Sequence, residues 1–184
     1  MPFDVASVRA HFPSLAEGAA HFDGPGGSQV PDVVGRAIAD TVTAAISNRG
    51  TFTPSERRAD AVVADFRSAY ADFLGADPRG IVHGRSATAL TYDFSRTLAK
   101  NWGPGDEIVV TRLDHDSNQL PSVQAAQSPG ATMRWVDFDP ATGELTADAV
   151  AAVVTERTRL VATTAASNLI GTKPPVCHIS RLAH

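Results

Sequence analysis

The sequence predicts an α/β protein in which a helical N-terminal arm precedes a mostly parallel sheet with flanking helices. Two observations support this class. From residue 80 onward, short apolar or β-branched runs alternate with helical patterns of about ten to fourteen residues, which is typical of β-α-β units. The preceding residues are helical without this alternation. We therefore predict a helical arm or subdomain over residues 1–79 and an α/β unit over residues 80–184.

Composition excludes several classes of protein. The 184 residues are 43% hydrophobic with a net charge of −4, and the basic residues are scattered, so no nucleic-acid partner and no membrane surface is predicted. No apolar run approaches the roughly 20 residues that cross a bilayer. Cys177 is the only cysteine, and the N-terminus lacks a signal-peptide pattern, so we expect a cytoplasmic protein without an internal disulfide.

The arm is expected to contain three helices, over residues 4–12, 31–47 and 54–74. Asp4 is the predicted N-cap of the first helix, and Gly75 is the predicted stop of the third. The second and third helices each carry an apolar stripe that we expect to be buried, comprising Val34, Ala37, Ile38, Val42, Ala45 and Ile46, then Val62, Phe66, Tyr70 and Phe73. The glycine-rich stretch 24–28 lacks a complete phosphate-loop pattern, so a turn is favoured over nucleotide binding.

Strands and helices alternate in the second part. Strands are predicted over residues 81–83, 108–110, 132–138 and 159–164. Helices are predicted over residues 87–100, with Leu90, Phe94 and Leu98 facing inward, and over residues 117–127, 146–154 and 176–184. Because ligands bind beyond the carboxyl ends of strands in open α/β sheets, the residues after each strand are the candidates for a site.

Polar residues follow three of these strands. Gly84, Arg85 and Ser86 enter a helix, where free N–H groups and a hydroxyl suit a phosphate, although N-capping by Ser86 alone explains the pattern. His115 lies in the turn after the strand over 108–110 and is either a ligand-binding residue or a surface cap. Asn168 is either a hydrogen-bonding side chain of the same crevice or an ordinary turn residue.

The order of four segments resembles a known family. FDGPGGSQVP, a G-x-[ST] helix entry, GPGDEIVVTRLDHDSN and TRLVATTAASNLIGT follow one another in the chain. This series resembles the N-terminal part of class V aminotransferases, most closely the cysteine desulfurase-like group of pyridoxal-phosphate enzymes. The resemblance implies the fold type I, aspartate aminotransferase-like large domain, here incomplete. It also implies pyridoxal 5′-phosphate as cofactor, an amino acid as substrate and a homodimer as the working assembly.

The resemblance also implies roles for individual residues. His115 matches the histidine that stacks on the cofactor ring and can relay protons, and it is the predicted catalytic residue. Arg85 and Ser86 match positions that hold the cofactor phosphate, although many relatives carry two threonines there followed by an acid. Asn168 matches the asparagine that hydrogen-bonds the phenolic oxygen of the cofactor. No metal site is predicted.

The family's covalent lysine has no match in this sequence. Lys100 and Lys173 are the only lysines, and neither lies in the S-x-H-K setting of the family. Cys177 is expected to be a small buried hydrophobe at the start of a helix rather than a nucleophile. We therefore predict the N-terminal portion of an amino-acid-processing enzyme that is inactive as this chain alone. The family does not specify whether the reaction is desulfuration, transamination, elimination or epimerisation.

Two alternatives remain open. One is a non-catalytic, truncated α/β protein that dimerises or binds a partner. The other is a nucleotide-binding module that uses residues 84–86, which lacks the glycine fingerprints of such modules.

Overall fold

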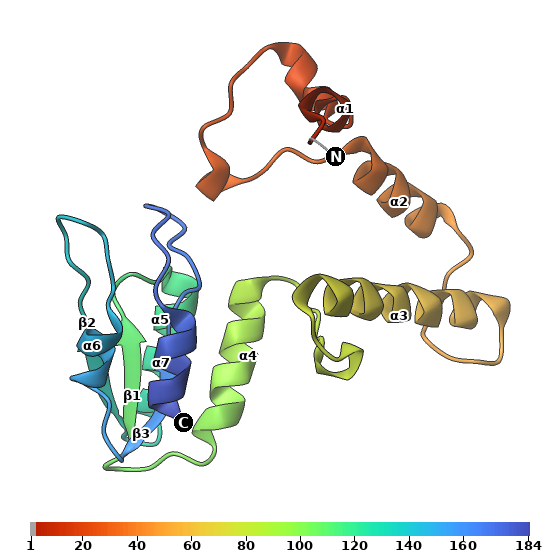
Figure 1. The fold of residues 1–184 in the computed structure, drawn as a ribbon. Coiled ribbons are helices and arrows are strands. Elements are labelled where there is room, and N and C mark those ends of the chain that lie inside the picture. The colour runs from red at the N-terminus through yellow and green to blue at the C-terminus, as the bar shows by residue number, and fades with distance from the viewer. Residues whose placement is uncertain (1–2) are drawn as a thin grey trace. The chain divides into compact units, whose positions relative to one another are not determined.

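The computed structural model in Figure 1 describes residues 3–184 and separates the chain into two units. The first unit ends at Val82, and the second spans His83–His184. The division lies three residues after the predicted boundary between residues 79 and 80. All candidate site residues belong to the second unit.

The first unit is helical, as predicted. It contains α1 (Val5–Arg9), α2 (Asp32–Thr43) and α3 (Pro54–Leu74), together with the short 3-10 helices η1 (Pro13–Glu17), η2 (Gly24–Gly26) and η3 (Pro78–Gly80). Asp4 caps α1 by accepting the Ser7 N–H at 3.1 Å. Thr53 and Glu56 form a capping box at the start of α3, and Gly75 ends this helix with a φ of 62°. The glycine-rich stretch is a turn built around η2.

The predicted burial of the two apolar stripes is wrong for this structure. No residue of α2 is buried, and Ile38 and Val42 are 60% and 73% exposed. On α3 the buried residues are Ala59 and Ala71, whereas Phe73 is 83% exposed. The periodicity predicted the helices correctly, but periodicity says only that a face is apolar, not that another element covers it. Among the described residues of the first unit there is no sheet and no third long helix that could cover these apolar faces.

The second unit is built on a parallel sheet of three strands. These are β1 (Glu107–Thr111), β2 (Thr132–Val136) and β3 (Thr158–Ala162), in the order β2-β1-β3. Val109 aligns with Arg134 on one side and with Val161 on the other. The central strand β1 is buried throughout, which agrees with its nearly continuous apolar run.

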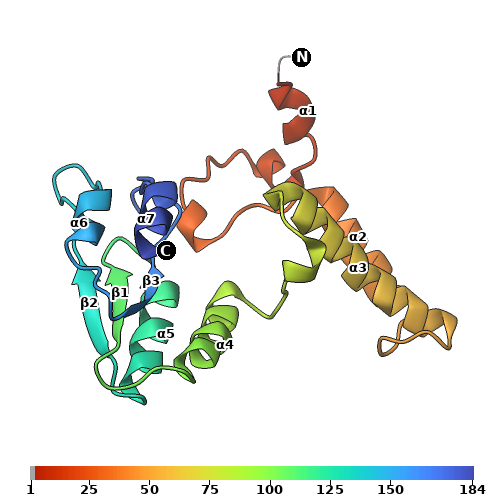
Figure 2. The same ribbon diagram turned by 60° about the horizontal axis from the view of Figure 1, so that its bottom comes forward.

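Helices cover both faces of this sheet (Figures 1 and 2). On one face α6 (Ala147–Ala151) and α7 (Val176–Ala183) bury Val150 and Ile179 against Val109 and Val136. On the other face α5 (Asp116–Gln127) buries Ala126 against alternate residues of β1, and α4 (Ala87–Ala99) packs on α5. Each fully buried aliphatic side chain stabilises such a core by about 1.5–3 kcal/mol. The sheet is therefore a rigid support for the loops that follow its strands.

Two predictions about residues 81–100 are wrong. Residues 81–83 form no strand, because a strand requires a hydrogen-bonded neighbour and none of the three sheet strands pairs with this segment. Phe94, predicted to face inward from α4, is 65% exposed. Here α4 packs against α5 rather than directly on the sheet, so part of its apolar face lacks cover within this unit.

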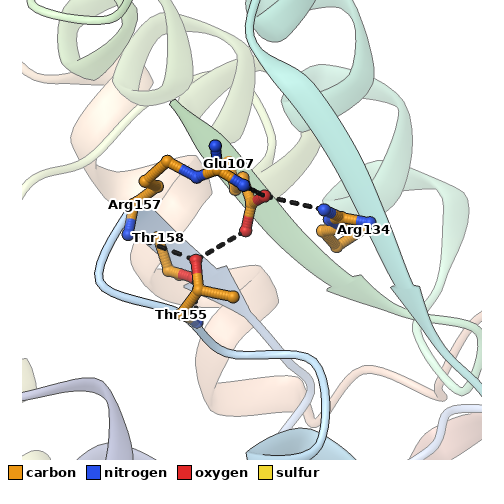
Figure 3. Close-up of polar contacts among 5 residues, drawn as sticks. All are labelled: Glu107, Arg134, Thr155, Arg157 and Thr158. Carbon is orange, nitrogen blue, oxygen red and sulfur yellow. Dashed lines mark hydrogen bonds and ion pairs between the residues drawn. The ribbon is translucent and has the colours of Figure 1, made fainter. Parts of the chain in front are cut away.

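A buried carboxylate at the start of β1 contacts β2 and the segment that precedes β3, at the end of the sheet opposite the candidate site (Figure 3). Glu107, only 2% exposed, accepts hydrogen bonds from Arg134 at 2.8 Å and Arg157 at 3.1 Å. The Thr155 hydroxyl donates to its other oxygen at 2.7 Å. Hydrogen bonding by Arg134 is the main cause that lowers the pKa of Glu107.

Among residues 3–184, no helix combines the length and apolar character that crossing a lipid bilayer requires.

Candidate cofactor site

The candidate site begins where β1 ends. Thr111 is the last residue of this strand, and the turn 112–115 leads directly into α5. Gln119 stabilises the turn, since its side-chain amide donates to the backbone oxygens of Thr111 at 3.0 Å and Asp114 at 2.9 Å. The turn is thus fastened to the first helical residues and presents His115 at the carboxyl edge of the sheet.

His115 is the N-cap of α5. Its Nδ1 accepts the backbone N–H of Ser117 at 3.0 Å and lies 2.8 Å from the Ser117 hydroxyl oxygen. Because Nδ1 accepts a hydrogen bond, a neutral ring in this arrangement carries its proton on Nε2. The capping interpretation of His115 is confirmed. It does not compete with a binding role, because the ring is exposed and only one of its nitrogens is used.

The residue before the histidine is a buried carboxylate. Asp114 is 9% exposed, and its oxygens accept hydrogen bonds from the Thr111 hydroxyl and from the Asn118 amide, the latter at 2.6 Å. Burial raises the pKa of Asp114, although hydrogen bonds from Thr111, Asn118 and the Thr164 backbone act in the opposite direction. The sequence prediction did not single out Asp114. The sequence did contain a signal for this cluster, because Thr111 lies three residues before Asp114 and Asn118 lies four residues after it.

The loop after β3 is tightly folded around Ser167. The Ser167 N–H donates to the Thr172 oxygen at 2.8 Å, and the Ser167 hydroxyl accepts the N–H of Ile170 at 3.3 Å. Gly171 closes the loop with a φ of 77°, a conformation that residues with a side chain rarely adopt. These bonds leave Asn168 exposed on a loop of defined shape.

His115 and Asn168 line one pocket. It has a volume of about 290 Å³ and is bordered by the turn after β1, the loop after β3 and Phe138. The two residues predicted from separate strand ends therefore lie at the same depression of the surface. Arg85 and Ser86 are not among its lining residues.

Ser86 is the N-cap of α4, as the capping interpretation of the sequence predicted. Its hydroxyl oxygen accepts the Ala89 N–H at 3.1 Å. A Cβ on Gly84 would lie 2.6 Å from the Leu90 side chain, so any larger residue here would require Leu90 to move. The first N–H groups of α4 have no partner within the helix, and the Ser86 hydroxyl can still donate its hydrogen. Arg85 is exposed beside this helix end.

The N-terminus of α4 faces the same edge of the sheet. A second cavity, of about 210 Å³, is lined by Thr91 from α4, Asn118 from the first turn of α5 and Thr163 from the end of β3. Thr91 lies a little more than one turn from Ser86. The cavity is also lined by Phe94, Ser95 and Leu98, so it lies along the side of α4, and neither Arg85 nor Ser86 lines it or the pocket of His115 and Asn168.

Three other candidates lie elsewhere. Lys100 is the C-cap of α4 and Lys173 follows the loop after β3, and neither lines the pocket of His115. Cys177 was predicted to be buried, and this is wrong, since it is exposed in the first turn of α7. The buried apolar contact of this helix is made by Ile179, two residues on. In the described part of the chain, no three His, Cys, Asp or Glu side chains gather as metal ligands would.

The donor set fits pyridoxal phosphate. A flat imidazole and a side-chain amide line one pocket, and helix N–H groups with a hydroxyl are found at the N-terminus of α4. The cofactor presents an aromatic ring, a phenolic oxygen and a phosphate, which require these three kinds of partner.

Comparison with known proteins decides the family. The family model described as Aminotransferase class-V matches residues 20–184. The chain belongs to the class-V aminotransferase family. The family resemblance predicted from the four segments is confirmed, and pyridoxal phosphate is the cofactor that membership implies.

Two relatives show how the chain relates to longer members of the family. It is 37% identical over 188 residues to the uncharacterised protein MT3887 of Mycobacterium tuberculosis (strain CDC 1551 / Oshkosh), and 32% identical over 196 residues to a probable cysteine desulfurase of Halobacterium salinarum. Each alignment covers 100% of this chain and 46% of the relative. The chain thus spans about half the length of the relatives that it matches.

Solved structures confirm the fold. The apo cysteine desulfurase of Thermococcus onnurineus NA1 superposes with a TM-score of 0.87 at 24% identity, covering 100% of this chain and 45% of that one. CsdA of Escherichia coli gives 0.84 at 25% identity, with 100% and 47% covered. In another neighbour, a C-DES mutant with a TM-score of 0.72 at 24% identity over 95% of this chain and 45% of that one, glycine is covalently linked to the pyridoxal-phosphate cofactor. The class-V member described here has the fold type I architecture predicted from the resemblance.

Proposed function

We propose that this chain forms the N-terminal part of a cysteine desulfurase-like, pyridoxal-phosphate-dependent enzyme that acts on an amino acid. The observation that carries the proposal is the common pocket of His115 and Asn168, which follow different strands. The N-terminus of α4, which Ser86 caps, is the proposed site for the cofactor phosphate. The proposal includes a homodimeric working form and a location in the cytoplasm.

Each of the proposed binding residues acts through a specific group. His115 holds the cofactor ring by the face of its imidazole, while Nε2, left free by the cap at Nδ1, can hold or pass a proton. The Asn168 amide donates to the phenolic oxygen. The Ser86 hydroxyl and the first N–H groups of α4 bind the phosphate, with Arg85 beside them. When bound, the cofactor supplies an electron sink for cleavage of bonds at the amino-acid α-carbon.

Neither Lys100 nor Lys173 is proposed to attach the cofactor covalently. Lys100 ends α4 at the terminus opposite Ser86, and Lys173 lines a cavity with Glu144 and Thr172. Neither lysine lines the pocket of His115 and Asn168. This chain alone is therefore proposed to bind the cofactor reversibly and to be inactive.

A binding measurement tests the non-covalent part. Pyridoxine 5′-phosphate lacks the aldehyde and cannot react with lysine, so calorimetric titration measures only the proposed contacts. We expect saturable binding that is at least about tenfold tighter than that of pyridoxine, because a charged hydrogen-bonded group contributes roughly 1.5–3 kcal/mol. Equal affinities for the two compounds, or no saturable binding, would contradict the proposal.

A labelling experiment tests the covalent part. The chain is mixed with pyridoxal phosphate, reduced with borohydride and analysed by peptide mass spectrometry. We expect only weak labelling spread over Lys100, Lys173 and the N-terminal amine. A stoichiometric adduct at one lysine would show that the chain carries its own covalent site.

One observation favours a second function, that of a non-catalytic truncated α/β protein that dimerises or binds a partner. The helices α2 and α3 leave large apolar side chains exposed, among them Ile38, Val42 and Phe73. Exposed apolar patches of this kind are typical of interaction surfaces. Association without any affinity for pyridoxine 5′-phosphate would favour this second function.

A further inference from the structure

Among the described residues that line the pocket of the two proposed ring-binding side chains, Arg112 is the only lysine or arginine. It follows β1 directly, and its backbone N–H donates to the Val136 oxygen at 2.9 Å, which fixes its main chain against the end of β2. The two lining carboxylates are Asp114, which is buried, and Asp116 in the first turn of α5. The cofactor contacts of the proposed function leave the positive charge of Arg112 unused.

Two contacts hold the guanidinium group of Arg112. Its Nε lies 2.8 Å from Oδ1 of Asp137, and its central carbon lies 4.7 Å from the centroid of the Trp135 ring. A planar guanidinium that lies over an aromatic ring is more restricted than a free side chain. Because the ion pair is made from Nε, the outer edge with the two terminal amino groups remains for a second anion.

The ion pair of Arg112 lies at the rim of the pocket. Asp137 does not line the pocket, but the next residue, Phe138, does. The side chains of Arg112 and Asp137 are 54% and 79% exposed. Exposed ion pairs of this kind contribute little to stability, so stability alone does not account for a cation at this position.

The rest of the lining determines what kind of ligand this cation can meet. Phe138, Leu169 and Ile170 form apolar walls beside the two ring-binding residues. An apolar pocket with one charged group at its rim takes a ligand that has an apolar or flat body and an opposite charge. An amino acid that lies beside the cofactor ring presents a carboxylate, whose two oxygens match the fork of an arginine.

We propose that Arg112 binds a carboxylate of the amino acid that occupies the pocket beside the cofactor ring. The inference deepens the proposed function and rests on it for the presence of the ring. The carboxylate is either the one at the α-carbon or one in the side chain, since both offer the same pair of oxygens. Arg112 thus selects negatively charged ligands, whereas His115 and Asn168 hold the ring.

Calorimetric titration with stable adducts tests this assignment. The 5′-phosphopyridoxyl group is joined through a reduced C–N bond to L-alanine, which keeps only an α-carboxylate, or to γ-aminobutyrate, which keeps only a distal one. Each adduct is compared with the adduct of the amine that lacks its carboxylate, ethylamine or propylamine. We expect at least one carboxylate adduct to bind about fivefold to tenfold more tightly than its partner, because hydrogen bonds to charged groups are the stronger ones. The pair with the larger ratio identifies the carboxylate.

Substitution of the arginine links this preference to one side chain. Arg112→Gln should reduce the ratio of affinities to about one, because the charge and the fork are lost. Arg96→Gln is the matched control. The Arg96 guanidinium also lies over an aromatic ring, 5.3 Å from the Tyr92 centroid, and beside a carboxylate, 3.7 Å from Asp93, but it does not line this pocket. This control should keep the full ratio. If Arg112→Gln fails to fold, Arg112→Lys keeps the charge without the planar fork and should lower the ratio.

The ratio compares ligands that share the ring and the phosphate, so a failure of this inference differs from a failure of the proposed function. Equal affinities within both pairs, or a ratio that persists in Arg112→Gln, would overturn the role of Arg112 while the ring still binds. Absence of binding for pyridoxine 5′-phosphate and for every adduct would overturn the proposed function, and the role of Arg112 with it.

Discussion

Ser86 shows how one side chain can stabilise a helix and also be a candidate for ligand binding. Its oxygen caps α4, and its hydrogen is available to a phosphate. Thr146 caps α6 in the same way, by accepting the Ala149 N–H at 3.1 Å, but it lies far along the chain from the proposed site. The two caps form a matched pair for separating stability from binding.

Substituting each cap by alanine tests this distinction. Ser86→Ala and Thr146→Ala should each destabilise the chain by about 1 kcal/mol, because each leaves a helix N–H without its acceptor. Only Ser86→Ala should also weaken binding of pyridoxine 5′-phosphate. Denaturant unfolding and calorimetric titration measure the two effects, and equal affinities in the two variants would exclude Ser86 from the phosphate site.

Glu107 determines a pH dependence that is separate from the site. Arg134, Thr155 and Arg157 together hold the pKa of Glu107 below its ordinary value of 4.5. The stability that Glu107 contributes is therefore complete above that value and is lost as pH falls through the lower folded pKa. We expect Glu107→Gln to reduce the fall in melting temperature on acidification from about pH 6 to pH 3. Glu156→Gln, at an exposed neighbouring position, should retain the full fall.

At the residue scale, the sequence correctly placed His115 and Asn168 after strands, but Arg85 and Ser86 follow no strand of the sheet, and the pattern did not predict how the side chains are held. His115 and Asn168 were found because each follows a β-branched or apolar run. Asp114 was missed although its two side-chain donors, Thr111 and Asn118, are near in sequence, because the burial that makes the carboxylate unusual depends on the packing of the whole unit. The burial of Cys177 was predicted incorrectly, since a short helix buries only one narrow stripe and Ile179 occupies it.

At the element scale, β1 contributes side chains to both hydrophobic clusters of the second unit. Its residues alternate between the cluster around Val109 and the cluster around Ile108 and Val110. No position of a fully buried central strand tolerates a change in side-chain size, because each side chain packs on one of the two helix layers.

Truncation of a β1 side chain measures this dependence. Ile108→Ala should destabilise the chain by about 2–5 kcal/mol through loss of packing and creation of a cavity. Leu182→Ala, in α7 at a 42% exposed position, removes a side chain of similar size and should cost less than about 1 kcal/mol. Urea denaturation of both variants gives the comparison, and a cost below about 1 kcal/mol for Ile108→Ala would contradict the packing described.

The sequence pattern predicted the bounds of the periodic helices and strands within a few residues, but it did not predict which elements would pack against them. The strands and helices after residue 100 all form where the pattern predicted, and β1 to β3 are parallel as expected. Residues 81–83 do not form a strand, because pairing requires a neighbour that local sequence cannot supply. The same reason explains the exposed stripes of α2 and α3.

At the scale of the whole molecule, the chain combines a well-packed α/β unit with a helical unit that exposes apolar side chains. It also covers about half the length of the relatives that it matches. The exposed apolar side chains of the helical unit predict that the chain associates with itself.

Light scattering after size exclusion tests this association. We expect the apparent mass to rise with concentration and to fall in the variant Ile38→Ser with Val42→Ser, which makes the exposed face of α2 polar. The paired control Thr41→Ser changes the same helix without removing apolar area of similar size. A monomer at all concentrations in the unsubstituted chain would contradict the prediction.

The central claim is that His115 and Asn168 hold the ring of a pyridoxal-type cofactor. The direct measurement is calorimetric titration of pyridoxine 5′-phosphate into the unsubstituted chain, His115→Ala, Asn168→Ala and the exposed control Asp148→Asn. We predict that each site variant weakens binding roughly fivefold, as expected for loss of an aromatic contact or one hydrogen bond. The control should match the unsubstituted chain. Unchanged affinity in both His115→Ala and Asn168→Ala would contradict the account.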